Sequence, residues 1–281
     1  MHNKATKYSL FLFLIFVIFA CDKNDPSVNA ARVRLKLSAS SPYVVTTNEN
    51  FIVKELHLDV NRIEVTVLDT LGKQSEWIPL EFKAREFNLL SLSGGKSIQI
   101  VDQYFPANQT ITAIRLVFGE KSRAVPTTGV DNAQKLIIPD ALKDGLALPV
   151  IVNLYSNNIS SIVIDIQTAF AVAEVNGNYF LNPVSRVFPE TFGGTLRGTV
   201  SPREASATVL ITQETDTFFT IPEPEGLFFF SGLNEGYWKV HLLANRLSGF
   251  RDSIFTDSVF QGKVTQVSVK LLPAEPAEGE E

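Results

Sequence analysis

Thiol and imidazole groups are scarce in this chain. Its 281 residues include a single cysteine, Cys21, and three histidines, of which His2 stands at the very start. A disulfide within the chain is therefore excluded, and a zinc site would lack most of its usual donors. His57 and His241 each fall in an alternating pattern, where an ordinary strand residue is the simpler interpretation. The sequence also lacks a Gly-x-Ser-x-Gly elbow and a glycine-rich phosphate loop, so we expect no enzyme, no metal and no cofactor.

Concentrated positive charge is also missing. The 25 lysines and arginines are interspersed with 30 acidic residues, which gives a formal net charge of -5. Nucleic-acid binding depends on clustered basic side chains, so we do not expect it. Asp140 and Asp144 stand near Gly145, and with Asp131 they are conceivable calcium ligands, although solvated loop carboxylates are the simpler interpretation.

Long apolar runs are few, and the most prominent one ends at Cys21. Lys4 and Lys7 precede the apolar segment 10–20, which as a helix would span about half of a bilayer's hydrocarbon core. A positive head, an apolar middle and a small residue before the cut are typical of a secretory signal peptide. The segment resembles a bacterial lipobox, which implies that residues 1–20 are removed and that Cys21 becomes the lipidated first residue. The alternatives are a signal peptide cut elsewhere or a short anchor with an incidental cysteine.

The residues that follow the cysteine indicate where such an anchor would lie. Residues 21–30 are short and polar, and we expect them to form a lipidated tether. The cluster Asp22 to Asp25 resembles, imperfectly, the acidic signals that send some Gram-negative lipoproteins to the outer face of the outer membrane. In enteric-type sorting an Asp directly after the cysteine would instead retain a lipoprotein in the inner membrane. A family resemblance in the residues that follow favours the outer membrane, so we expect attachment there through Cys21 with display at the cell surface. The alternatives are the periplasmic face and a cluster that is only a solvated tether.

Most of the remaining chain alternates between apolar and polar residues. In "RVRLKL", Val33, Leu35 and Leu37 share one face, as in a half-buried strand. In "LHLDVNRIEVTV" the apolar residues switch from even to odd positions, which predicts a bulge or tight turn near Asn61 or Arg62. Only "EFNLLSLSGG" has the spacing of a short helix. Many short strands predict an all-β sandwich or barrel.

Six segments carry a family resemblance: "IEVTV", "WIPLEFKAREFNLLSL", "ITAIRLVFG", "KLIIP", "SIVIDIQTAFAV" and "NGNYFLNPVSRV". Together they resemble the domain-of-unknown-function 4382 family, which is typical of bacterial lipoproteins and is regarded as an immunoglobulin-like or related β-sandwich. The sequence departs from the family at Asn88 and Gln167, where Asp is common. The resemblance implies a first β-sandwich domain over residues 31–188.

The composition of the sequence changes after this domain. Residues 189–193, within "PETFGG", have the proline and glycine of a linker. Residues 194–273, with "PEGLFFFSGLNEGYWKVHLLA" and "QGKVTQVSVKLLP", resemble the carboxypeptidase regulatory-like domain, a transthyretin-like sandwich that has no catalytic residues of its own. Alternation places Phe228 and Phe230 in its core. The acidic residues 274–281 are expected to form a disordered tail.

Aromatic side chains are the remaining candidates for a binding site. Trp77, Tyr179 and Trp238 could stack on sugar rings, although packing is the simpler interpretation. Trp238 and Tyr237 lie on opposite phases of one strand, so one of them must face outward or toward the other domain. We therefore expect a non-enzymatic envelope lipoprotein that presents its sandwiches to a protein partner or a surface assembly. The alternative is a glycan-binding surface lipoprotein, which would need an exposed platform of two or three rings.

Overall fold

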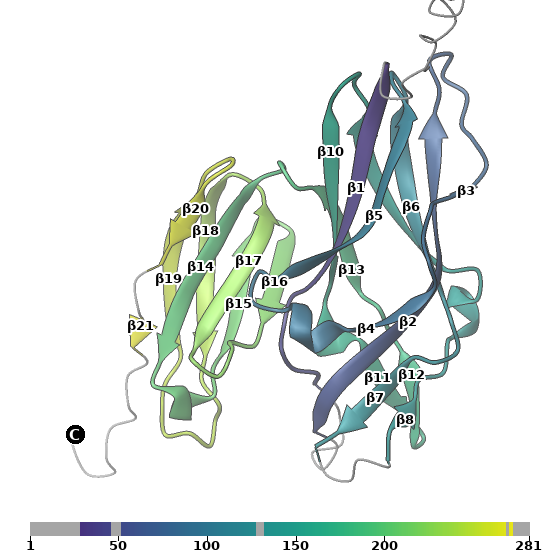
Figure 1. The fold of residues 1–281 in the computed structure, drawn as a ribbon. Coiled ribbons are helices and arrows are strands. Elements are labelled where there is room, and N and C mark those ends of the chain that lie inside the picture. The colour runs from purple at the N-terminus through teal and green to yellow at the C-terminus, as the bar shows by residue number, and fades with distance from the viewer. Residues whose placement is uncertain (1–28, 46–51, 128–131, 268–269, 272–281) are drawn as a thin grey trace, which may run out of the picture.

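The computed structural model describes residues 29–45, 52–127, 132–267 and 270–271. The predicted signal peptide, Cys21 and the acidic tail 274–281 lie outside these residues. Within them, the chain forms two β-sandwiches that lie side by side (Figure 1). The prediction of an all-β fold with two sandwiches is confirmed. None of the helices in the described part of the chain is long and apolar enough to cross a membrane.

One sheet of the first sandwich has the strand order β13-β10-β1-β5. Its strands are β1 (Ala30–Ala39), β5 (Ser97–Pro106), β10 (Ile159–Ile166) and β13 (Ser185–Pro189). β1 runs parallel to β10 and antiparallel to β5.

The opposite sheet has the order β8-β7-β2-β6-β9, and β3 and β4 also pair with β2. Its strands are β2 (Val53–Leu68), β3 (Ile78–Pro79), β4 (Arg85–Asn88), β6 (Thr110–Phe118), β7 (Arg123–Pro126), β8 (Gln134–Lys135) and β9 (Leu146–Asn153). Three 3-10 helices and a hairpin complete the domain: η1 (Leu89–Leu92), η2 (Asp140–Leu142), η3 (Thr168–Phe170), β11 (Val172–Val175) and β12 (Asn178–Leu181).

Residue alternation decides which face of each strand is buried. Val33, Leu35 and Leu37 of β1 are almost completely buried, as predicted. In β2 the pairing with β6 shifts register between Val60 and Arg62, so the predicted bulge is confirmed. Because the bulge adds one residue, the apolar positions on both sides of it point into the same core.

Other predicted strands differ from the observed ones in length. "EWIPLEF" pairs only at Ile78–Pro79, and "SIVIDIQTAF" leaves the sheet at Ile166 and turns into η3. "NYFLNPVSRVF" forms two strands, β12 and β13, because Pro183 has no N–H to donate to a strand ladder. The short helix expected in "EFNLLSLSGG" is confirmed as η1.

The second sandwich also has two sheets, ordered β17-β14-β20, with β21 pairing with β14, and β16-β15-β18-β19. Its elements are β14 (Gly194–Ser201), η4 (Arg203–Ala205), β15 (Thr208–Gln213), β16 (Asp216–Thr220), β17 (Leu227–Leu233), β18 (Gly236–Leu243), β19 (Ser253–Val259), β20 (Val264–Gln266) and β21 (Lys270–Leu271). The predicted core positions Phe228 and Phe230 are confirmed, with exposures of 1% and 3%.

The buried apolar side chains form two separate clusters. The first runs from Ala31 to Leu181 and the second from Leu196 to Val267. Phe188 is buried but belongs to neither cluster. A Cβ atom on Gly232 would approach its ring to 2.5 Å, so Phe188 packs directly against the second sandwich. The space between the sandwiches is therefore a packed interface with its own buried residues.

Candidate functional site

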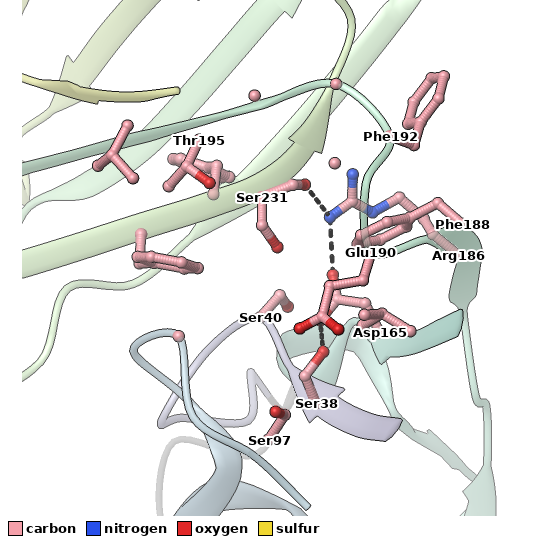
Figure 2. Close-up of a pocket in the computed structure, with 18 of the residues that line it drawn as sticks. Ser38, Ser40, Ser97, Asp165, Arg186, Phe188, Glu190, Phe192, Thr195 and Ser231 are labelled. Atoms are coloured by element: carbon pink, nitrogen blue, oxygen red, sulfur yellow. Dashed lines mark hydrogen bonds and ion pairs between the residues drawn. The ribbon is translucent and has the colours of Figure 1, made fainter. Parts of the chain in front are cut away.

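A cavity of about 260 Å³ lies between the two sandwiches (Figure 2). The outer face of the β13-β10-β1 sheet lines one side, and β14 and β17 of the second sandwich line the other. The linker and the segments 95–97 and 262–264 contribute the remaining walls. The cavity is the place where the polar face of the first domain meets the second domain.

A row of three paired polar residues crosses the floor of this cavity. Ser38 on β1 lies opposite Asp165 on β10, and Asp165 lies opposite Arg186 on β13. The Ser38 hydroxyl donates a hydrogen bond to Asp165 over 3.0 Å, and Arg186 Nη2 donates to the same carboxylate over 2.8 Å. The Asp165 side chain is only 7% exposed. A carboxylate buried to this degree requires such partners, because an unpaired charge away from water is costly.

Arg186 also connects this row to the second sandwich. Its Nη2 donates to the backbone carbonyl of Ser231 over 3.2 Å, as one of the dashed lines in Figure 2 shows. Its guanidinium carbon lies 4.1 Å from the ring centre of Phe218 and 5.2 Å from that of Phe188. The planar guanidinium can stack and donate hydrogen bonds at once, which a lysine cannot do. One side chain therefore holds an ion pair in one domain and two contacts to the other.

Further contacts between the domains surround the cavity. The Thr220 hydroxyl donates to the carbonyl of Ser40 over 2.5 Å, and the rings of Phe170 and Phe219 stack with centroids 5.0 Å apart. Glu223 of the second domain accepts a hydrogen bond from the Ser93 hydroxyl over 3.4 Å and lies 3.7 Å from Lys96 Nζ. These contacts fix the orientation of the two sandwiches on both sides of Arg186.

Some polar groups that line the cavity form no hydrogen bond with another described residue. Gln167 is 7% exposed, and its Oε1 accepts a hydrogen bond from the Ser40 hydroxyl over 3.1 Å. Among the described residues, Arg186 Nε is buried without a hydrogen-bond partner, and no hydrogen bond is formed by Gln167 Nε2, by Arg186 Nη1 or by the Ser231 hydroxyl. The cavity therefore offers free donors and a hydroxyl group to a ligand.

The same outer face carries another ion pair farther from the cavity. Arg32 donates from Nε and Nη2 to the two carboxylate oxygens of Asp102, over 2.6 and 2.8 Å. These hydrogen bonds lower the pKa of Asp102. The paired arginine and carboxylate side chains explain how the polar face of β1 is stabilised outside the interface.

Trp238, one of the three candidate ligand-binding residues, lies in a hydrophobic core. Its side chain is completely buried in the second cluster, where its Nε1 donates to the carbonyl of Asn234 over 2.9 Å and its ring stacks on Phe218. Tyr237, on the opposite phase, is 75% exposed. The prediction that Trp238 could bind a ligand is therefore wrong, because its side chain lies in the core of the second sandwich, where a ligand cannot reach it.

Trp77 and Tyr179 do not combine into a binding platform. Trp77 is half-buried, and the guanidinium of Arg115 lies 4.3 Å from its ring centre. Tyr179 lies in β12 and packs against the first cluster. Trp238 lies in the other sandwich, inside the second cluster. The three side chains belong to separate environments.

The histidines and loop carboxylates are likewise dispersed. His57 Nε2 lies 2.7 Å from a carboxylate oxygen of Glu55, and His241 lies on the outer face of β18. Asp140 pairs with Lys143 over 2.7 Å, and Asp131 lies outside the described residues. In the part of the chain that the structure describes, no three His, Cys, Asp or Glu side chains gather in a way that could hold a metal ion.

Sequence reasoning missed the central residue of the cavity, Arg186, and did not place Gln167 in a site. One signal was present, because Asp165 is a carboxylate inside the apolar strand "SIVIDI". A charge in such a strand requires a partner, and the partner here is the arginine that follows Ser185 in β13. The sequence does not show that this arginine also reaches the second domain.

The fold and the cavity define an all-β protein in which two sandwiches share a polar interface. The family model described as Domain of unknown function (DUF4382) matches residues 31–183, more than half of the chain. The chain belongs to this family, and the resemblance of the first domain is confirmed. The resemblance of residues 194–273 to the carboxypeptidase regulatory-like domain stays a prediction.

No curated protein matches this chain. Among solved structures, it is similar to the Bacillus anthracis TIE protein, with 9% identity and a TM-score of 0.25 over 84% of this chain and 39% of that one. The shaft pilin SpaA from Lactobacillus rhamnosus GG has 9% identity and a TM-score of 0.26 over 88% and 99% of the two chains. GBS52, the minor pilin of Streptococcus agalactiae, has 12% identity and a TM-score of 0.24 over 88% and 98%. Likeness at this level does not extend to function.

Proposed function

We propose that the protein is a non-enzymatic binding module of the cell envelope, which presents two β-sandwiches in a fixed orientation to a partner in a surface assembly. The observation that carries the proposal is the interface around Arg186. Its buried ion pair, its hydrogen bond to the Ser231 carbonyl and its stacking on Phe218 hold the two domains in one arrangement. A surface that is already ordered before binding loses less conformational entropy when a partner docks.

The anchor is the second part of this proposal. Cleavage after residue 20 leaves Cys21 at the start of the chain, where acyl chains attach it to the outer membrane with the sandwiches on the cell surface. Acyl chains contribute roughly 0.8 kcal/mol per buried methylene, so several chains hold a protein to one leaflet. The alternative within this proposal is the same anchor with the domains facing the periplasm.

Replacing Cys21 by serine tests the anchor, and Asn24→Ser is the matched control in the same tether. We expect Cys21→Ser to abolish incorporation of labelled fatty acid and to release the protein from membranes, and the control to behave like the wild type. Proteinase added to intact cells should digest the wild-type protein if it is displayed. Protection until the outer membrane is opened would favour the periplasmic face, and a Cys21→Ser protein that stays in membranes after signal cleavage would contradict the anchor.

We also propose that residues 31–188 and 194–273 are separate folding units joined by the linker 189–193, with 274–281 as a disordered tail. The two hydrophobic clusters support this division. Limited proteolysis should cut first near the linker and leave two fragments that each keep a cooperative unfolding transition. Loss of structure in both fragments after that cut would instead mean that the domains depend on each other.

The alternative of glycan binding loses one of its three candidate rings. That alternative required an exposed platform of two or three rings, and Trp238 is completely buried.

A further inference from the structure

We propose that the cavity between the sandwiches binds a small, neutral, polyhydroxylated ligand, such as one hexose unit, free or at the end of a glycan. This inference rests on the proposed function and deepens it, because it names the class of ligand that the binding module would recognise. The site differs from the aromatic residues considered above. It depends on Gln167 and Arg186 of the first domain and on Ser231 of the second.

The size of the cavity limits the ligand. Its volume of about 260 Å³ lies just below the roughly 300–1,000 Å³ of sites for drug-sized molecules. A single sugar ring suits such a space better than an extended chain or a peptide. Both domains contribute to the walls, so a ligand would contact both sandwiches at once.

The free hydrogen-bonding groups match hydroxyl groups. Gln167 Nε2 and Arg186 Nη1 are donors with no partner among the described residues, and the Ser231 hydroxyl can donate or accept. Arg186 Nε is buried and has no hydrogen-bond partner among the described residues, and a buried polar group of this kind is costly unless water or a ligand pairs with it. Figure 2 shows Ser231 and Ser40 on facing sides of the cavity. A ligand with several hydroxyl groups could pair with both sides.

Four of the charged groups that line the cavity are paired within the protein, and a fifth, Lys263, has no ion pair among the described residues and lies 5.7 Å from the ring centre of Phe260. Asp165 pairs with Arg186 over 2.8 Å, and Glu190 pairs with Lys36 over 2.5 Å. Lys96 lies 3.7 Å from Glu223. An ionic ligand that approached Asp165, Arg186 or Glu190 would compete with these internal pairs, whereas a neutral ligand uses only the hydrogen-bonding groups that remain free.

Two phenylalanines give the cavity an apolar wall. Phe192, which follows β13, is 43% exposed and stands at the edge of the cavity in Figure 2. Phe229 of β17 lines the same space, and a Cβ atom on Gly95 would lie 2.9 Å from its ring. Sites that combine aromatic walls with a few convergent polar groups are typical of small-molecule binding. The apolar face of a sugar ring can pack on such a wall while its hydroxyl groups reach the polar floor.

The experiment titrates the purified full chain with free glucose, galactose, mannose and N-acetylglucosamine, followed by saturation-transfer NMR and calorimetry. The detergent that holds the chain must have no sugar headgroup. A second arm uses oligosaccharides that end in the same sugars, which distinguishes a free sugar from the terminal unit of a glycan. We expect saturable binding of at least one sugar in one arm.

Two variants locate the binding site. Gln167→Leu and Ser231→Ala should each raise the Kd about threefold to tenfold, the effect of losing one neutral hydrogen bond. Gln134→Leu and Ser156→Ala change the same residue types outside the cavity and should leave the Kd unchanged. Urea midpoints of all four variants show whether each is folded. If Gln167→Leu is unfolded, the milder Ser231→Ala decides the question.

The proposal is overturned if the folded wild-type chain binds none of these sugars, or if binding is unaffected by the cavity variants. Either result can occur in a protein that is lipidated and displayed, so it would leave the proposed function standing. Conversely, the wild-type chain could bind a sugar while the Cys21→Ser protein stays in membranes. That pair of results would contradict the anchor and leave the binding site standing.

Discussion

Replacing Arg186 by alanine tests whether this side chain couples the two sandwiches. The change removes the cation that pairs with Asp165, the donor to the Ser231 carbonyl and the guanidinium that stacks on Phe218. The ion pair lies inside the first domain, and the other two interactions cross the interface. We therefore expect the first sandwich to be destabilised more than the second.

The size of the expected loss in unfolding free energy follows from the burial of Asp165. Its side chain is 7% exposed, and after the change the hydroxyl of Ser38 would be its one remaining donor among the described residues. Leaving one member of a buried ion pair without its partner costs about 3–5 kcal/mol of unfolding free energy. The hydrogen bond and the stacking that reach the second sandwich contribute about 1 kcal/mol. With a urea m-value of about 2 kcal/mol/M, the midpoint of the first domain should fall by roughly 2 M and that of the second by roughly 0.5 M.

The chain has two tryptophans, and they make the two transitions separately visible. Trp77 belongs to the first sandwich and Trp238 to the core of the second. In a Trp238→Phe background, fluorescence reports the first domain, and in a Trp77→Phe background it reports the second. Urea unfolding of Arg186→Ala in both backgrounds gives the two midpoints. Arg251→Ala, at an exposed position, is the matched control and should move neither.

Two results would refute this reasoning. The first is an Arg186→Ala protein whose midpoints match the wild type, since the buried carboxylate would then not need its cation. The second is a urea midpoint that falls further when Trp238 reports unfolding than when Trp77 reports it. Adding Asp165→Asn to Arg186→Ala should restore part of the missing stability, because the unpaired charge is removed.

Three other predictions follow from the packing, the charges and the backbone. Trp238→Ala should lower the unfolding free energy by about 3–5 kcal/mol, whereas Tyr237→Ala should change it by less than about 0.5 kcal/mol; equal effects in urea unfolding would contradict the observed orientation of β18. The lowered pKa of Asp102 contributes stability above the pKa of the unfolded carboxyl, which is lost as pH falls through the folded pKa. Asp102→Asn should therefore lower the urea midpoint at neutral pH, and its difference from the wild type should shrink as pH falls below the pKa of the unfolded carboxyl; a difference that stays constant in acid would argue against the ion pair. Gly193 and Gly72 both have positive φ, but only at Gly193 would a Cβ atom meet a backbone carbonyl. Replacing Gly72 by alanine should cost about 1 kcal/mol, and Gly193→Ala should lower the melting temperature further.

Much of the secondary structure follows from local patterns. The alternation in β1 and the phase switch in β2 were sufficient to predict the buried face and the bulge, because the orientation of strand side chains repeats every two residues. Strand ends were predicted less well. Only two residues of "EWIPLEF" pair, since pairing depends on a neighbouring strand that local sequence does not specify.

The sequence by itself determined that this protein is all-β, that its strands belong to two sandwiches and that Phe228 and Phe230 are buried. Only the tertiary structure decided that Trp238 faces the core and Tyr237 the outside, because alternation assigns two opposite faces without saying which one is covered. It also decided that Asp165, Arg186 and Ser231 meet at one cavity. These residues are far apart in the chain, and their meeting depends on how the second sandwich packs against the polar face of the first.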